Sequence, residues 1–199
     1  MIHTHTEWGK LREVIVGREL ELPHRVMDTT FRAFYASNIR HNQFSQYDEY
    51  KISADLIQER IEDLNTLADT LSGLGVAVLR PDSVTRSVPV KTPTFNSLLS
   101  SASNVRDLTI TYRDMIIETP PLIRGRYFEN RNLHKIFKQQ FHEGSKWLRA
   151  PDALMTDESF DEEEWDNDRD FDNIDYNRWD LGIDAAQYLK LGKDVFCNI

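Results

Sequence analysis

The sequence offers few residues for nucleophilic or metal chemistry. Its single cysteine, Cys197, cannot form an internal disulfide or a multi-cysteine metal site. It follows Val195 and Phe196 in an apolar run that predicts a buried strand, where a thiol is an inert small side chain rather than a nucleophile. His3 and His5 alternate as on a strand, but no third metal ligand accompanies them. We therefore expect a frayed N-terminus there and no metal site.

Acidic side chains concentrate in one stretch. Residues 157–180 contain 12 acidic and 2 basic residues, a net charge of -10, whereas the whole chain carries -9. The run 166–172 has the composition of a calcium-binding loop, but Phe171 stands where that loop needs glycine and Asn177 where it needs glutamate. We interpret 157–180 as a variable, solvated insertion. The near-neutral remainder argues against a nucleic-acid partner.

Two aspartates and an arginine-rich segment are candidates for ionic binding. Asp107 precedes a strand-like run, where an aspartate commonly lies in a turn and faces water. Asp184 precedes residues 185–191, which we predict to be a helix with Asp184 as its N-cap. Arg126 and Glu129 are three residues apart and could form an ion pair, so we expect their segment to be structural rather than an anion site. The arginines of this segment are Arg124, Arg126 and Arg131.

Strand and helix patterns alternate along the chain and predict an α/β fold. Strands are expected over 11–17, 76–79, 108–111, 115–117 and 146–148, and helices over 53–72 and 125–141. The order strand, helix, strand occurs twice, and the equivalent residues Arg80 and Arg149 are 69 positions apart, from 80 to 149. We interpret this spacing as a weak internal repeat of one structural module.

Composition favours a soluble globular protein. The 199 residues are 40% hydrophobic and 29% charged, no apolar run approaches the ~18 residues of a membrane span, and no targeting segment is readable, so we expect a cytoplasmic location. Residues 184–196 are typical of the opening of a further module, after which the chain stops. We therefore expect a fragment or a truncated reading frame, because an unpartnered strand would expose its backbone groups.

Collinear segments between residues 7 and 196 resemble one known family. Residues 7–18 (EWGKLREVIVGR) are similar to the family's opening NEWDPLEEVIVGR, with Gly9 and Lys10 in place of Asp-Pro. Residues 106–107 and 116–120 (RD and IIETP) are similar to the family's RD and IIEAP, and residues 124–131 (RGRYFENR) to its RARFFEYR. Residues 144–151 (GSKWLRAP) are similar to the family's GAKW and AP, and residues 184–196 (DAAQYLKLGKDVF) to its DAADFIRAGRDIF. The family is that of the arginine:acceptor amidinotransferases, and the resemblance is to its N-terminal half.

This resemblance implies a pentein fold, a five-bladed α/β propeller of repeated modules around a central active site. Five modules of the length noted above would need roughly 350 residues. We therefore expect 1–199 to be an incomplete amidinotransferase domain that holds about the first two to three modules.

The resemblance also implies a mechanism. In the family a cysteine thiolate attacks the guanidino carbon of arginine, ornithine leaves, and an amine acceptor takes the amidino group, with a histidine as general acid and base. By motif, Asp107 falls on the aspartate that binds the substrate guanidinium, and Asp184 on the aspartate that orients the histidine. The catalytic histidine and cysteine are expected beyond Phe196, so the chain alone should be inactive.

Two other functions stay open at this point. One is a noncatalytic half-pentein that binds a partner or a guanidino ligand through Asp107; the other is a guanidine-modifying hydrolase of the deiminase type, which the segment 124–131 disfavours. The expected partners are arginine and an amine acceptor, with no cofactor, nucleic acid or membrane, and a homo-oligomer stays open. The segment 31–52 is the local candidate for choosing the acceptor, whose identity the sequence does not predict.

Overall fold

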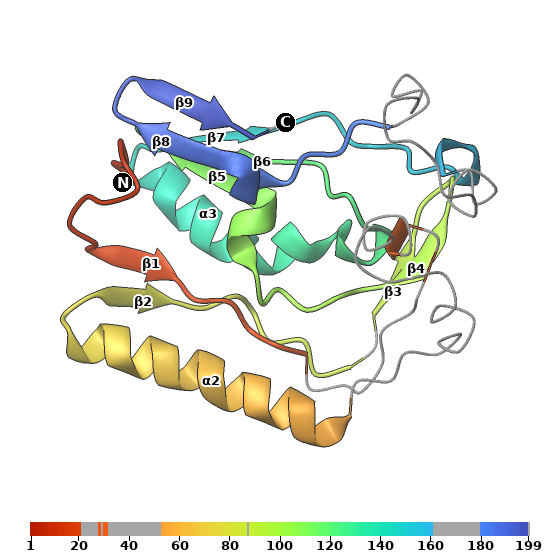
Figure 1. Ribbon diagram of the computed structural model, residues 1–199, viewed down its shortest axis with the longest axis horizontal. Coiled ribbons are helices and arrows are strands. Elements are labelled where there is room, and N and C mark those ends of the chain that lie inside the picture. The colour runs from red at the N-terminus through yellow and green to blue at the C-terminus, as the bar shows by residue number, and fades with distance from the viewer. Residues whose placement is uncertain (21–27, 29, 32–52, 87, 161–179, 199) are drawn as a thin grey trace.

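The computed structural model describes residues 1–20, 28, 30–31, 53–86, 88–160 and 180–198 of the chain. These residues form an α/β structure in which helices α2 and α3 accompany four small sheets (Figure 1). The α/β prediction is confirmed. The predicted acceptor loop beyond Phe31 and the centre of the acidic insertion, 161–179, lie outside the described residues.

The first strand, helix, strand unit consists of β1 (Glu13–Ile15), α2 (Ala54–Gly73) and β2 (Ala77–Leu79), and its two strands are parallel. The helix begins where predicted because Ser53 caps it, with Oγ accepting from the backbone N–H of Leu56 at 3.2 Å. The strands are only half-buried, because this sheet is two strands wide among the described residues.

The second unit repeats this plan. Strand β5 (Thr109–Tyr112) forms an antiparallel hairpin with β6 (Met115–Glu118), and β6 pairs in parallel with β7 (Lys146–Arg149) after the helix α3 (His134–His142). Strands β2 and β7 begin at 77 and 146, so the predicted 69-residue repeat is confirmed as two parallel units. Its core is the fully buried cluster Ile116, Leu133 and Phe137.

The predicted helix over 125–141 is wrong in its first half. The chain forms two 3₁₀ turns, η3 (Arg124–Arg126) and η4 (Glu129–Leu133), and only then the α-helix. Arg124 and Glu129 are buried in these turns, and two arginines of the segment make tertiary contacts, Arg124 with the backbone oxygen of Met155 and Arg126 with Asp107. Tertiary ion pairs therefore override the helical periodicity of this segment.

The predicted helix over 185–191 is also wrong. A short 3₁₀ turn, η8 (Ala185–Gln187), leads into a hairpin of β8 (Tyr188–Leu191) and β9 (Asp194–Cys197). Gly192 begins the two-residue turn with φ of +75°, a conformation that glycine adopts without strain. Strand β9 is exposed rather than buried, because only β8 pairs with it among the described residues.

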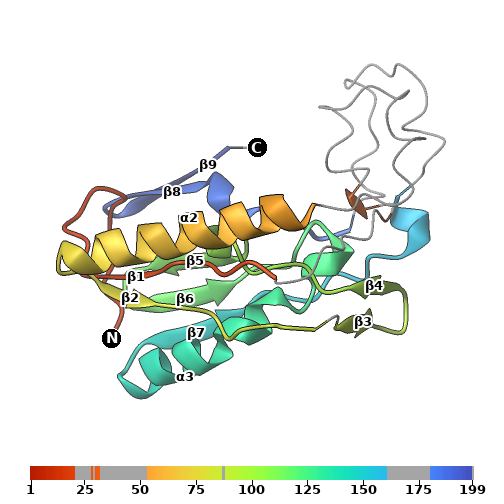
Figure 2. The ribbon, with the colours of Figure 1, turned by 90° about the horizontal axis from the view of Figure 1, so that it is seen from below.

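Two further features were not predicted. A hairpin of β3 (Pro89–Lys91) and β4 (Asn96–Leu98) packs into a second apolar cluster around Val90, Phe95 and Met155. The N-terminal residues are not frayed, since Thr4 and Thr6 form isolated antiparallel bridges with Arg113 and Leu191. Figure 2, turned by 90°, shows α2 and α3 on different sides of the strands.

The described residues form separate small sheets and no closed propeller. The five-bladed arrangement therefore stays a prediction. Within the same residues, no helix combines the length and the apolar content needed to cross a membrane.

Candidate functional site

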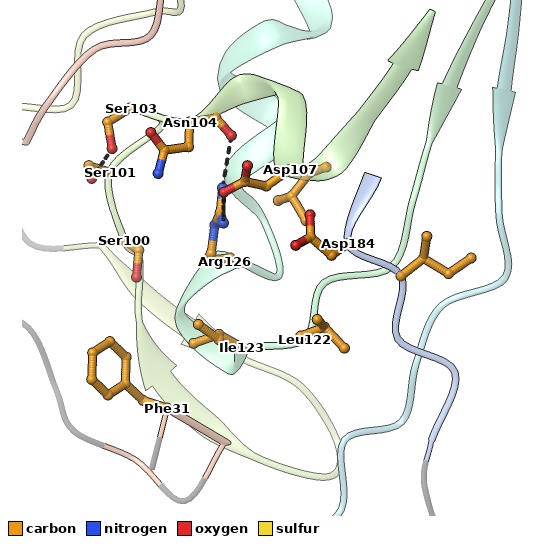
Figure 3. A pocket seen from close by; sticks show the side chains of 12 residues that line it. Phe31, Ser100, Ser101, Ser103, Asn104, Asp107, Leu122, Ile123, Arg126 and Asp184 are labelled. Atoms are coloured by element: carbon orange, nitrogen blue, oxygen red, sulfur yellow. Dashed lines mark hydrogen bonds and ion pairs between the residues drawn. The ribbon is translucent and has the colours of Figure 1, made fainter. Parts of the chain in front are cut away.

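One pocket brings the two predicted aspartates together. It has a volume of about 90 Å³, and we name it the aspartate pocket. Its charged lining residues are Asp107, Arg126 and Asp184. The uncharged lining residues are Phe31, Ser100, Ser101, Ser103, Asn104, Leu108, Leu122, Ile123 and Ile183. Figure 3 shows Asp107 and Asp184 on neighbouring backbone segments beside the Arg126 side chain.

Asp107 lies in the 3₁₀ turn η2 (Val105–Leu108), directly before strand β5. One of its carboxylate oxygens, Oδ2, accepts a hydrogen bond from Nη1 of Arg126 at 2.7 Å. The other oxygen, Oδ1, has no protein partner among the described residues. A carboxylate can accept several hydrogen bonds, so Asp107 retains capacity for a second cationic donor.

Arg126 is itself held by a buried acid. Its Nε and Nη2 donate to Oε2 and Oε1 of Glu129 at 2.6 and 2.8 Å, and Nη2 also donates to the backbone oxygen of Asn104 at 3.0 Å. Burial alone would lower the pKa of the Arg126 guanidinium, but the hydrogen bonds and charges of Glu129 and Asp107 outweigh burial and raise that pKa. The pair Arg126–Glu129 is confirmed, and its contact with Asp107 was not predicted.

Asp184 caps the turn η8. Its Oδ1 accepts from the backbone N–H of Ala186 at 2.9 Å, while Oδ2 lies 3.5 Å from Nε2 of Gln187. The predicted capping role is therefore confirmed, although the capped element is a 3₁₀ turn rather than an α-helix. The weakly engaged Oδ2 leaves this carboxylate able to accept another donor.

The opposite wall of the pocket is a serine-rich loop that sequence reasoning missed. A Cβ on Gly17 would lie 1.9 Å from the backbone oxygen of Ser103, and a Cβ on Gly125 would lie 2.6 Å from Oγ of Ser100. The loop is thus packed against two glycines. Gly125 stands where the family motif RARFFEYR has alanine, and the close approach of Ser100 gives a physical reason for this difference.

The other sequence candidates lie away from the pocket lining. Arg124 is buried and donates to the backbone oxygen of Met155 at 2.9 Å, and Arg131 stacks on Phe128 at 3.7 Å from the ring centroid, so both are structural as expected. Cys197 is exposed, which corrects the predicted burial of its thiol. The rings of His3 and His5 are in contact, 4.6 Å apart. No cluster of three or more potential metal ligands occurs in the described part of the chain.

Known proteins match both the sequence and the fold. The chain is 30% identical to the mitochondrial glycine amidinotransferase of Xenopus laevis over 205 residues, covering 98% of this chain and 48% of that protein. It is also 30% identical to inosamine-phosphate amidinotransferase 1 of Streptomyces griseus over 196 residues, covering 98% and 54%. This chain is related to the amidinotransferases. No family model matches the sequence.

Solved amidinotransferase structures have a similar fold. An inosamine-phosphate amidinotransferase from Streptomyces griseus superposes with a TM-score of 0.79 at 28% identity, covering 98% of this chain and 54% of that one. An amidinotransferase of the saxitoxin biosynthetic pathway from Microseira wollei gives 0.72 at 25% identity, with the same coverage. The chain therefore spans about half the length of the amidinotransferases it matches.

Proposed function

We propose that this chain supplies the guanidinium-binding part of an amidinotransferase, which moves the amidino group of L-arginine to an amine acceptor. The observation that carries this proposal is the meeting of Asp107 and Asp184 in one pocket, although they are 77 positions apart in the sequence, from 107 to 184. The relatives named above support the reaction class, since all are called amidinotransferases.

The chemistry of the pocket suits a guanidinium ion. Guanidinium is planar and cationic and presents paired N–H donors, so it binds where carboxylate oxygens are available side by side. Asp107 already binds one guanidinium, that of Arg126, through Oδ2. In our proposal its Oδ1 binds the guanidinium of the substrate, and Arg126 with Glu129 holds the carboxylate in place for that contact.

The proposed reaction passes through a covalent intermediate. A cysteine thiolate adds to the guanidino carbon, and the bond from that carbon to the side-chain nitrogen of ornithine then breaks, with a proton transferred to the leaving nitrogen by a histidine. The acceptor amine next gives a proton back to the histidine, attacks the same carbon and displaces the thiolate. Asp184 would accept a hydrogen bond from this histidine and hold its ring orientation and tautomer.

The single cysteine of the chain does not serve as this nucleophile in our proposal, because Cys197 does not line the aspartate pocket. Because the chain supplies no cysteine nucleophile at this pocket, a second candidate function is a noncatalytic module that binds guanidino ligands at Asp107. A hydrolase of the deiminase type is less well supported, since the matched proteins are named as transferases. The cytoplasmic location stays a prediction.

Binding of L-arginine to the chain tests the guanidinium site. Asp107→Asn removes the charge from a charged hydrogen bond worth about 1.5 to 3 kcal/mol, so arginine affinity should fall about tenfold or more in titration calorimetry. Asp114→Asn is the matched control, because Asp114 is another partly exposed aspartate that pairs with Lys146 away from the pocket. Equal affinities of Asp107→Asn and Asp114→Asn would refute the site.

Asp184→Asn should differ in kind. In an active enzyme that contains this chain, it should lower kcat much more than it weakens arginine binding, because it disturbs the proposed histidine and not the guanidinium. Rate constants and apparent arginine affinity should therefore be measured for both variants. If both variants keep turnover and affinity within a few-fold of the parent, the assigned roles are wrong.

A further inference from the structure

An acidic residue near the N-terminus connects the two segments that carry the pocket aspartates. Oε2 of Glu7 accepts from Nη1 of Arg106 at 2.8 Å, and Oε1 of Glu7 accepts from the backbone N–H of Lys190 at 3.1 Å. Nζ of Lys190 lies 3.7 Å from the same Oε1. We call Glu7, Arg106 and Lys190 the Glu7 junction.

Two residues of the junction belong to the segments that carry the aspartates. Arg106 precedes Asp107 within the turn η2. Lys190 is in β8, which directly follows the turn η8 that Asp184 caps, and η2 packs against η8. Nη2 of Arg106 adds a direct link by donating to the backbone oxygen of Tyr188 in β8 at 3.1 Å. The position of η2 relative to β8 is therefore held both by this direct bond and by the contacts that Glu7 makes with Arg106 and Lys190.

The charges make Glu7 necessary to this arrangement. The side chain of Lys190 is only 13% exposed, and its pKa is lowered chiefly by burial and further by the nearby Arg106 cation. Burial would raise the pKa of Glu7, but its hydrogen bonds to Arg106 and to the backbone of Lys190 outweigh burial and lower it. Without the Glu7 carboxylate, the Lys190 ammonium and the 49% exposed Arg106 guanidinium would lose the acid that they share, and their repulsion, partly screened by water, would weaken the contact between η2 and β8.

We propose that Glu7 is a positioning residue, which sets the relative placement of Asp107 and Asp184 by holding Arg106 and Lys190 together. The inference rests on the proposed function for its consequence, guanidinium binding, but its structural part is independent of that function. The pocket thus depends on a residue that does not line it.

Hydrogen exchange at three amides tests the structural part. The amides are those of Asp107, which donates to the backbone oxygen of Asn104, and of Ala186 and Gln187, which donate to Asp184. In Glu7→Ala these three amides should exchange about tenfold faster or more, while amides in the middle of α2 keep their rates. Glu7→Gln should give a smaller change, because its amide oxygen still accepts from one partner but cannot neutralise the two cations.

Affinity for agmatine, a guanidinium compound that lacks a carboxylate, tests the consequence. Titrations should be run where every variant is folded by circular dichroism. Glu7→Ala should then bind agmatine about fivefold more weakly or worse, with Glu7→Gln in between. Glu143→Gln is the matched control. Like Glu7, Glu143 joins the N-terminal segment to a residue far away in the chain, here through an ion pair with the N-terminal amine, but it lies away from the pocket.

The outcomes separate the two hypotheses. Local acceleration of exchange at the three amides supports the positioning role even if the parent chain binds no agmatine, a result that would refute only the proposed function. Exchange that accelerates equally in α2, or an effect of Glu143→Gln equal to that of Glu7→Ala, would overturn the positioning role. Should Glu7→Ala fail to fold, Glu7→Gln and Arg106→Lys carry the same test.

Discussion

The two strand, helix, strand units have the same order of elements but contribute unequally to the aspartate pocket. In the first unit the 20-residue helix α2 comes after strand β1 and begins at a serine cap. It buries little charge. In the second unit α3 has only 9 residues, and the 3₁₀ turns before it bury Arg124 and Glu129. The turns of the second unit also contribute Arg126 to the aspartate pocket.

This difference shows how one repeated plan can acquire a site. The first unit is stabilised by local features, namely a cap, helical periodicity and a glycine at its end. The second unit replaces about two helical turns with a segment held by the long-range ion pairs Arg124–Asp157 and Arg126–Asp107 and by a local pair of Arg126 with Glu129. We therefore expect substitutions at the 3₁₀ turns of the second unit to affect the pocket, whereas most in the first unit should affect only stability.

The largest expected effect comes from Glu129 in the second unit. Its side chain is 1% exposed and pairs with Arg126. Removing one partner of a buried ion pair costs about 3 to 5 kcal/mol, so Glu129→Ala should lower the free energy of unfolding by about that amount. Denaturant titration measures this loss, and Glu143→Ala, an exposed acid on the same unit, serves as the control. A loss below about 1 kcal/mol would contradict the buried-pair account.

The next effect tests where the first unit meets the pocket. A Cβ on Gly17 would overlap the backbone of Ser103, so Gly17→Ala should cost about 2 to 3 kcal/mol of stability and displace the serine loop. At Gly73, the last residue of α2, a Cβ would meet nothing within 4 Å. Gly73→Ala should therefore leave stability unchanged or raise it by about 0.5 to 1 kcal/mol. Equal losses of stability for the two variants would show that the close approach of Gly17 to Ser103 has no particular effect on stability.

A smaller effect separates local from tertiary control of the helices. Ser53→Ala removes the side-chain cap of α2 and should lower the free energy of unfolding by about 1 kcal/mol without changing arginine binding. The corresponding residue before α3 is Leu133, which is fully buried in the core and provides no side-chain cap. If Ser53→Ala weakened arginine binding, the first unit would be coupled to the pocket more closely than we infer.

The smallest effect is a pH dependence in the second unit. Asp114 pairs with Lys146 at 2.9 Å, and chiefly this hydrogen bond lowers the pKa of Asp114 below its ordinary value of 3.8. A lowered carboxyl pKa stabilises the folded state above the unfolded-state pKa, and that stability is lost as pH falls through the folded-state pKa. Asp114→Asn should therefore flatten the loss of stability below pH 3.8 slightly, in denaturant titrations repeated across acidic pH. An unchanged pH profile would show that the pair contributes nothing.

Much of the fold could be predicted because its patterns are local. The helix over 53–72 and the strands around 76–79, 115–117 and 146–148 follow apolar periodicity and were confirmed. The errors fall where tertiary contacts compete with periodicity, at 125–141, or where turn chemistry was overlooked, at Gly192. The sequence Leu-Lys-Leu-Gly-Lys-Asp-Val-Phe alternates about a glycine turn, a pattern typical of a hairpin.

The candidate site could likewise be predicted from the sequence only in part. Motif resemblance pointed to the amidinotransferase relationship and to Asp107 and Asp184 as candidate residues, because motifs record residue types at set spacings. The sequence by itself also determined the α/β class, the capped helix α2 and the 69-residue repeat, all of which depend on interactions within short segments. Only the tertiary structure decided that Arg126 binds Asp107, that serines face the aspartates and that Glu7 joins η2 to β8. Those contacts span between 19 and 183 residues of chain, and ion pairs over such separations have no periodic or local pattern that a sequence can display.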